Sequence, residues 1–139
     1  MNGLELAQHL TKAVIGYSPR LTDLSALQKC SSLRWLELST LKRIADYEPV
    51  FGIEELRQLI FDKCHPIASL SHITRLHALE HLALIDTDVT DGNLAPALTL
   101  SRLSHFGIFP DKKHFVPRKA EVERVMKLRT AASSEESTP

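Results

Sequence analysis

Leucines and other apolar residues recur along this chain at a short, regular spacing that is most complete between Leu56 and Leu79. Within that stretch the apolar positions are Leu56, Leu59, Phe61, Cys64, Ile67, Leu70, Ile73 and Leu76, and the pattern starts again at Leu79. The alternation that ends at Phe61 predicts a half-buried strand. The steps of three that follow favour tight turns or 3₁₀ segments, in which every third side chain points the same way.

The same pattern returns with a period of 23 residues, and of 24 residues at the last step. Matching strand segments begin at residues 33, 56, 79 and 103, and a weaker copy lies at 10–15. A unit of this size cannot bury its apolar side alone, so the units are expected to stack on one another. Stacking of such units predicts an α/β solenoid with short parallel strands.

These repeats resemble the leucine-rich repeat family, in its short-repeat, bacterial type, over about residues 10–109. The resemblance implies a leucine-rich-repeat solenoid with a short parallel β-sheet on the concave face, 3₁₀, irregular or short helical returns, and a helical cap at each end. It implies one domain over residues 1–129, with the following parts: an N-terminal helical cap at 1–12, repeats at about 10–32, 33–55, 56–78 and 79–102, and a last strand with a C-terminal helical cap at 103–129. The polar stretch 130–139 is expected to be disordered.

The two caps rest on helical spacing. Near the N-terminus Leu4, Leu6, Ala7 and Leu10 predict a helix to about Thr11, which overlaps the first weak strand and leaves it only the region of residues 13–15. A cap is expected because an open solenoid end exposes core side chains. The alternative is that the chain is the C-terminal part of a longer repeat protein. Near the other end, Val122, Val125 and Met126 predict the inner stripe of a helix.

The return segments differ from one another. Where the family usually has an asparagine that bonds the backbone, this chain has Ser18, Leu41, Cys64 and Thr87. The leucine side chain cannot hydrogen-bond, so the second repeat is expected to deviate most. In the fourth return, residues 94–100 predict a short helix with Asp91 or Asn93 as its N-cap. The aspartates around it lack the spacing of a calcium loop, which favours turn and cap roles.

Composition narrows the function classes. The chain has 17 basic and 17 acidic residues and no net charge, which argues against binding to nucleic acid or to an anionic membrane. Its start lacks the basic and apolar regions of a secretory signal, and its apolar runs are too short to span a membrane. The two cysteines fall at repeat positions and are read as reduced and buried. We therefore expect a cytoplasmic protein.

In a stacked parallel sheet the repeated leucines point inward and the residues between them point outward. The outward residues form three columns: Lys12, Trp35, Gln58, His81 and His105; Val14, Glu37, Ile60, Ala83 and Gly107; Gly16, Ser39, Asp62, Ile85 and Phe109. Five strands spaced by about 4.8 Å give a face roughly 19 Å across. This face has the size of a modest protein contact.

The candidate binding site lies on this face. Trp35 is the single tryptophan, and tryptophan is enriched among the residues that dominate binding energy at interfaces. We expect a partner-binding surface that comprises Trp35, Glu37, Gln58, Ile60, Asp62, His81, Ile85, His105 and Phe109. The alternative is that Trp35 folds down over its neighbours or is covered by the N-terminal segment.

Two neighbouring histidines on the face raise the question of a metal site or a catalytic pair. With a carboxylate nearby, His81 and His105 could ligate zinc or form an acid–base pair. The repeat places no further ligand beside them, so we favour polar surface residues and expect no metal and no cofactor. The sequence has no glycine-rich phosphate loop and no HExxH, GxSxG or CxxC motif.

The sequence therefore favours a non-enzymatic protein–protein interaction module whose concave face binds a protein partner. Two alternatives stay open at this point. One is a small inhibitor or immunity-type protein that occludes a toxin or an enzyme. The other is the C-terminal segment of a larger leucine-rich-repeat scaffold. We expect a monomer, or self-association through the N-terminal edge.

Overall fold

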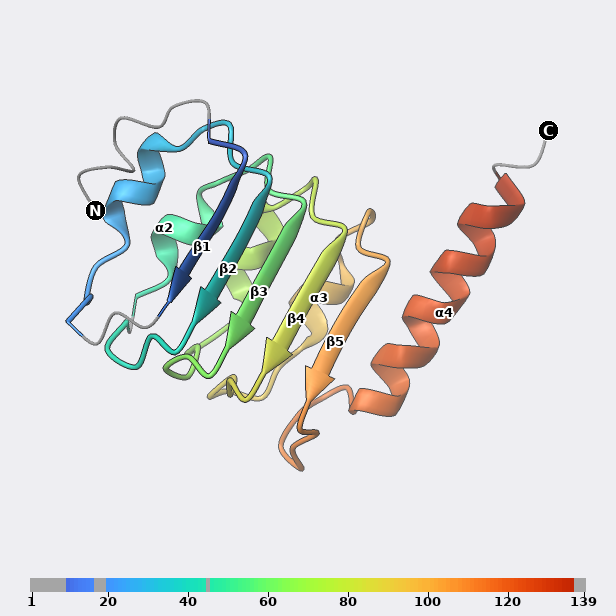
Figure 1. The fold of residues 1–139 in the computed structure, drawn as a ribbon. Coiled ribbons are helices and arrows are strands. Elements are labelled where there is room, and N and C mark those ends of the chain that lie inside the picture. The colour runs from blue at the N-terminus through green and yellow to red at the C-terminus, as the bar shows by residue number, and fades with distance from the viewer. Residues whose placement is uncertain (1–9, 17–19, 45, 137–139) are drawn as a thin grey trace.

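Five short strands form one parallel sheet in the computed structural model, which describes residues 10–16, 20–44 and 46–136. The strands are β1 (Lys12–Gly16), β2 (Trp35–Ser39), β3 (Gln58–Asp62), β4 (His81–Ile85) and β5 (His105–Phe109). They stand side by side in the order in which they occur along the chain (Figure 1). Each strand therefore pairs with the one that follows it in the sequence, as a stacked repeat requires.

The register of the sheet agrees with the period of the sequence. Trp35 is paired with Lys12 on one side and with Gln58 on the other, and the same column continues through His81 to His105. The other two outward columns are also in register. The predicted columns are thus confirmed, including the step of 24 residues between β4 and β5.

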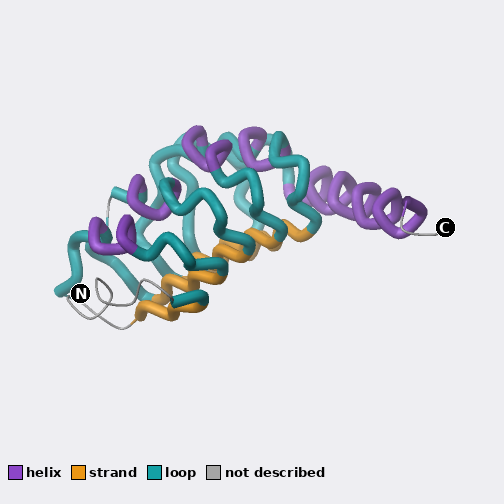
Figure 2. Tube along the Cα trace, turned by 90° about the horizontal axis from the view of Figure 1, so that it is seen from above, coloured by secondary structure: helices purple, strands orange, loops and turns teal. Residues whose placement is uncertain are grey.

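The returns between the strands alternate in type. The first and third contain the 3₁₀ helices η1 (Ser25–Lys29) and η2 (Ser71–Arg75), and the second and fourth contain the short α-helices α2 (Glu48–Phe51) and α3 (Ala95–Leu98). Both α-helical returns carry a proline in their first turn, where its fixed φ favours the helix. Figure 2 shows the strands along one side of the molecule and the helical returns along the other.

The core lies between these two sides. Most inward residues of the strands and returns are buried, and Leu36, Leu59 and Leu82 are fully so. Tyr47 packs its ring edge-on against Phe61, with centroids 5.2 Å apart. Its hydroxyl donates a hydrogen bond of 2.6 Å to the carbonyl oxygen of His65. The second repeat thus fills its return with an aromatic ring and satisfies that ring's polar atom.

The turns after the strands explain the missing asparagines. Thr40, Lys63 and Asp86 occupy equivalent positions and have positive φ angles of 56°, 55° and 48°. In the next residues, Thr87 Oγ1 accepts the backbone N–H of Cys64 at 3.1 Å, and Cys64 Sγ donates to the carbonyl oxygen of Leu38 at 3.2 Å. Short side chains therefore link one coil to the next, as an asparagine would.

The fourth return is helical as predicted, but shorter. The helix α3 covers Ala95–Leu98, and its N-cap is Leu94. Asn93 Oδ1 accepts the backbone N–H of Ala95 at 3.1 Å, and Asp91 Oδ1 accepts that of Asn93 at 2.9 Å. Neither polar residue is the N-cap itself; both instead close tight turns that lead into the helix.

The N-terminal prediction needs a correction where the structure describes it. Residues 1–9 of the predicted helical cap at 1–12 lie outside the described residues. Leu10 and Thr11 are not helical, and Lys12 begins β1. The reason is that the carbonyl oxygen of Thr11 accepts the backbone N–H groups of Arg34 and Trp35, at 2.8 and 3.0 Å. Pairing with the second repeat therefore decides the overlap in favour of the strand.

The C-terminal helix α4 extends over Lys119–Glu136. Its buried residues Val122 and Met126 lie against the last coil, as expected for a cap. The prediction of a disordered tail over 130–139 is wrong for residues 130–136, which continue the helix; 137–139 lie outside the described residues. Alanine and glutamate are common in this segment and favour a helix, and no glycine or proline interrupts it before Pro139.

Candidate binding surface

The outward columns form what we call the sheet face, and all nine predicted binding residues lie on it. Trp35 is half-buried there, and Lys12 Nζ lies 4.2 Å from its ring centroid. The indole Nε1 is buried and has no hydrogen-bond partner among the described residues. Trp35 thus belongs to the face, but packing against its neighbours covers much of it.

The face changes character from β2 to β5. Its centre, at Glu37, Ile60 and Asp62, is half-buried and mixes an apolar side chain with two carboxylates. At the far end of the last two strands, Phe109 is 62% exposed and Ile85 is 36% exposed. These two residues are register partners and form a continuous apolar area beside Lys119, whose Nζ lies 5.8 Å from the Phe109 ring.

His81 and His105 stack on each other at the opposite end of the same two strands. Their ring centroids are 5.6 Å apart, with an angle of 24° between the rings. Burial lowers the pKa of His81, and the neighbouring His105 lowers it further. Ser104 Oγ lies 3.0 Å from His105 Nδ1. Within the described residues no group of three or more histidine, cysteine or acidic side chains could hold a metal ion.

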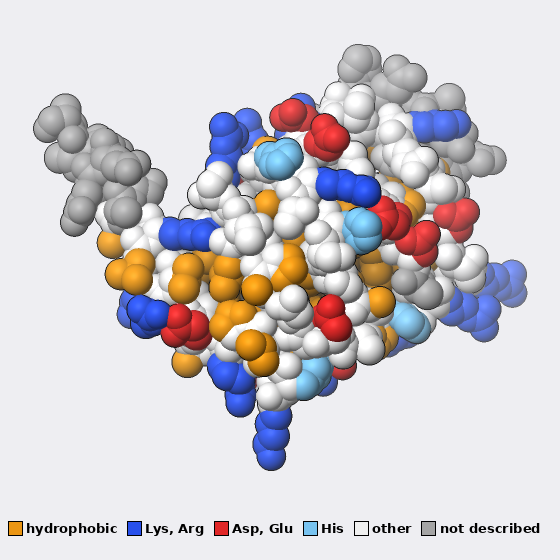
Figure 3. Space-filling view, turned by 180° about the vertical axis from the view of Figure 1, so that it is seen from behind, with side chains coloured by type: hydrophobic (Ala, Val, Ile, Leu, Met, Phe, Trp, Pro, Cys, Tyr) orange, Lys and Arg blue, Asp and Glu red, His pale blue; other side chains and the backbone are white. Residues whose placement is uncertain are grey.

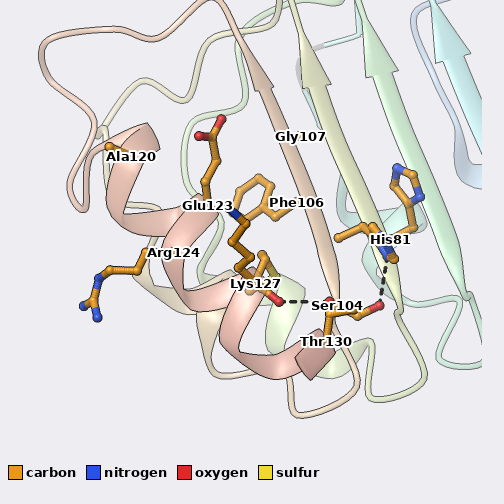
Figure 4. A pocket seen from close by; sticks show the side chains of 11 residues that line it. His81, Ser104, Phe106, Gly107, Ala120, Glu123, Arg124, Lys127 and Thr130 are labelled. Carbon is orange, nitrogen blue, oxygen red and sulfur yellow. Dashed lines mark hydrogen bonds between the residues drawn. The ribbon is translucent and has the colours of Figure 1, made fainter. Parts of the chain in front are cut away.

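A groove of about 790 Å³ separates the sheet face from α4. Its sheet-side wall consists of His81, Ser104, His105, Phe106 and Gly107, and its other wall of Ala120, Glu123, Arg124, Met126, Lys127 and Thr130 (Figure 4). Sequence reasoning missed the helical wall, because the tilt of α4 depends on packing and not on the repeat. The available sequence signal for the groove was the pair of small residues Ala83 and Gly107 in neighbouring strands, because their side chains fill little space above the sheet.

Arg129 fixes α4 to the solenoid and was not singled out by sequence reasoning. Its Nη1 donates to the carbonyl oxygens of Leu100 and Leu103, at 2.8 and 3.0 Å, and its Nη2 donates to that of Leu98. These carbonyls belong to the end of the fourth return. The guanidinium therefore supplies donors to the carbonyls of Leu98 and Leu103, and a second donor to that of Leu100, which also accepts the backbone N–H of Leu103.

The two thiols are not placed for nucleophilic chemistry. Cys30 and Cys64 are buried and are not joined by a disulfide. Burial raises the pKa of both thiols, which keeps them protonated at neutral pH. Their arrangement fits structural roles, such as the link from Cys64 to Leu38.

The side opposite the sheet face presents a mixed surface. Figure 3 shows charged and polar side chains scattered over it, with hydrophobic side chains gathered towards the α4 end. Leu128 and Val116 are more than half exposed. Within the described residues, no helix is both long and apolar enough to cross a membrane.

Comparison with known proteins finds similarity among solved structures. Neither the protein-family models nor the curated proteins produce a match. Among solved structures, an internalin (inlF) from Listeria monocytogenes superposes with a TM-score of 0.65 and a sequence identity of 24%. The match covers 78% of this chain and 32% of the internalin chain, so this chain corresponds to less than two thirds of the other protein.

This likeness concerns the backbone, and it agrees with the independent observations above. The internalin is a leucine-rich-repeat protein, and this chain has five parallel strands joined by short helical returns. The period of the sequence, the register of the sheet and the match to a solved structure therefore lead to one conclusion. The chain has the leucine-rich-repeat fold, in the form of a short α/β solenoid.

Proposed function

We propose that this protein is a non-enzymatic binding module that holds a protein partner against its sheet face. The observation that carries this proposal is the exposure of apolar side chains on a hydrogen-bonded parallel sheet. Val14, Ile85 and Phe109 project from three different strands whose backbones are fixed by pairing. Exposed apolar side chains beside carboxylates are typical of surfaces that bind other proteins.

The size of the face sets a condition on the partner. Five strands about 19 Å across and about 16 Å long offer roughly 300 Å². A stable interface of standard size buries about 800 Å² on each partner. A partner that binds the sheet face must therefore also contact the rim, and α4 is the largest element beside it.

A photo-crosslinking residue tests the proposal directly. It is introduced at Ile60, in the centre of the sheet face, and separately at Thr74, which is exposed on η2 at the opposite side. We expect one protein, identified by mass spectrometry, to be captured from position 60 and not from position 74. A Trp35→Ala/His81→Ala variant that is still folded by circular dichroism should lower the yield at position 60. Equal capture at both positions, or an unchanged yield in the variant, would refute the proposal.

The proposal includes a reducing compartment such as the cytoplasm. It is supported by the two cysteines, which are buried and not joined in a disulfide. Alkylation in denaturant, immediately after cell lysis, should add a label to both cysteines. Protein that stays unlabelled until a reductant is added would contradict this part.

A further inference from the structure

We infer that the groove between β5 and α4 binds an extended, acidic segment of the partner protein, with one apolar side chain of that segment seated over Gly107. This inference rests on the proposed function, because it assumes a protein partner. It adds the chemistry of the segment that the partner presents, and it assigns the binding to a place beside the repeat columns.

The groove has the length and the shape of an extended peptide site. Its helical wall runs from Ala120 to Thr130, which corresponds to about 15 Å of helix. An extended chain covers that length with about four or five residues. Figure 4 shows Gly107 and Ala120 at one end of the groove and Ser104 and Thr130 at the other.

The Gly107 end offers room for an apolar side chain. Apart from Gly107 itself and its two chain neighbours, a Cβ atom built on Gly107 would have one heavy-atom neighbour within 4 Å, the Cβ atom of Ala83 at 3.9 Å. The space above the strand is therefore open at this point. Phe106 and Met126, which are both buried, line the groove next to it and provide apolar walls.

At the Ser104 end, basic side chains form no ion pair with any carboxylate whose side chain the structure describes. A second cleft of about 430 Å³ shares Ser104 with the groove; its lining adds two arginines, Arg102 and Arg129, and one carboxylate, Glu80. Arg129 binds three carbonyl oxygens, which are neutral, so its full charge remains. Among the described side chains, neither Arg102 nor Lys127 forms an ion pair.

The described carboxylates nearest the groove, Glu123 and Glu80, each lie within ion-pair distance of a basic side chain. Glu123 Oε1 lies 4.0 Å from Lys119 Nζ, and Glu80 Oε2 lies 3.8 Å from Arg57 Nε. The chain as a whole has no net charge, so the surplus of positive charge among the described side chains at this end is local. A peptide with carboxylates at the Ser104 end complements it, and a basic peptide would be repelled.

Two peptide pools of matched length measure this preference. Both are fluorescein-labelled nonapeptides with Leu, Ile, Val or Phe at position 3 and Ser or Gly elsewhere. The acidic pool has Asp or Glu at positions 5 to 7, and the basic pool has Lys or Arg there. By fluorescence anisotropy, we expect the acidic pool to bind about tenfold or more tightly than the basic pool at 0.15 M salt.

Three variants locate the binding. Lys127→Glu/Arg102→Glu should weaken binding of the acidic pool by about tenfold or more, whereas the control Lys42→Glu/Arg43→Glu should change it less than about twofold. Both pairs lie on exposed residues, and the control pair belongs to the second repeat, away from the groove. Gly107→Trp fills the apolar end and should also weaken binding. Equal binding of both pools, equal loss in both double variants, or no binding at all would overturn the inference.

A nuclear magnetic resonance measurement provides a second readout that does not depend on the variants. The acidic pool should shift the backbone amide signals of Ser104 and Gly107 and leave that of Thr74 in place.

Crosslinking from Ile60 separates the two proposals. If Lys127→Glu/Arg102→Glu captures the partner there as well as the wild type does, the groove is excluded and the sheet face stands. If the wild type captures nothing there, the proposed function fails.

Discussion

Arg129→Ala is the substitution with the most direct structural consequence outside the core. The guanidinium donates to three carbonyl oxygens at the end of the fourth return, and it joins α4 to the last coil. Removal of the side chain takes a donor from all three carbonyls, although that of Leu100 still accepts the backbone N–H of Leu103 at 3.1 Å. A net hydrogen bond from a charged donor contributes about 1.5–3 kcal/mol, and the loss of several partners is not additive. We expect Arg129→Ala to lower the free energy of unfolding by about 3 kcal/mol.

Two further variants separate the hydrogen bonds from the charge. Arg129→Lys keeps the charge but cannot span three carbonyls with one ammonium group, so it should lose about half as much. Arg124→Ala, on the same helix, removes an exposed arginine that pairs with Glu121. Exposed pairs of this kind contribute little, and this variant should unfold like the wild type.

Urea unfolding followed by circular dichroism at 222 nm measures all three. In a separate thermal melt of a chain of this size, a loss of about 3 kcal/mol corresponds to a fall in Tm of roughly 10 °C. The reasoning fails if Arg129→Ala and Arg124→Ala unfold at the same urea concentration. It also fails if Arg129→Lys is as stable as the wild type, because the two donor nitrogens of the guanidinium would then contribute nothing beyond its charge.

Three other substitutions test specific features. Gly92 has a φ of 69°, and a Cβ atom there would lie 2.2 Å from the carbonyl oxygen of His114, so Gly92→Ala should cost about 3 kcal/mol or more in a thermal melt. Lys63 has a left-handed backbone, which asparagine tolerates better, so Lys63→Asn should gain about 0.5 kcal/mol while Lys42→Asn does not. The folded-state pKa of His81 is lowered by burial, so the unfolded state binds the proton more tightly. Stability should therefore fall as the pH drops through about 6.5, and His81→Gln should flatten that part of the curve; a histidine titration by nuclear magnetic resonance that finds an elevated pKa would contradict this.

The repeat period was sufficient to predict the sheet. Because one residue of slip would turn every side chain to the other face, the leucines of each repeat specify the register, and Trp35, Gln58 and His81 line up as expected. Periodicity was insufficient at the N-terminus. There, helical and strand patterns overlapped at Thr11, and hydrogen bonds from the next repeat decided between them.

The missed features of the C-terminal end depend on tertiary contacts. The tilt of α4, and with it the groove, follows from how Val122 and Met126 pack, which no spacing along the chain specifies. Arg129 did leave a signal. It follows these two residues at i+7 and i+3, so it falls on the buried stripe of the helix. A charged residue on such a stripe predicts a buried partner, here a set of backbone carbonyls.

The strand order has a consequence for how the molecule opens. Each coil rests on its neighbours alone, so the strand with the fewest buried side chains should detach first. In β1 one of five residues is buried, whereas β4 buries three. Amide protons of β1 should therefore exchange with deuterium well before those of β3 and β4. Opening would begin at β1 and spread towards β4, whose coil would stay folded until late in unfolding.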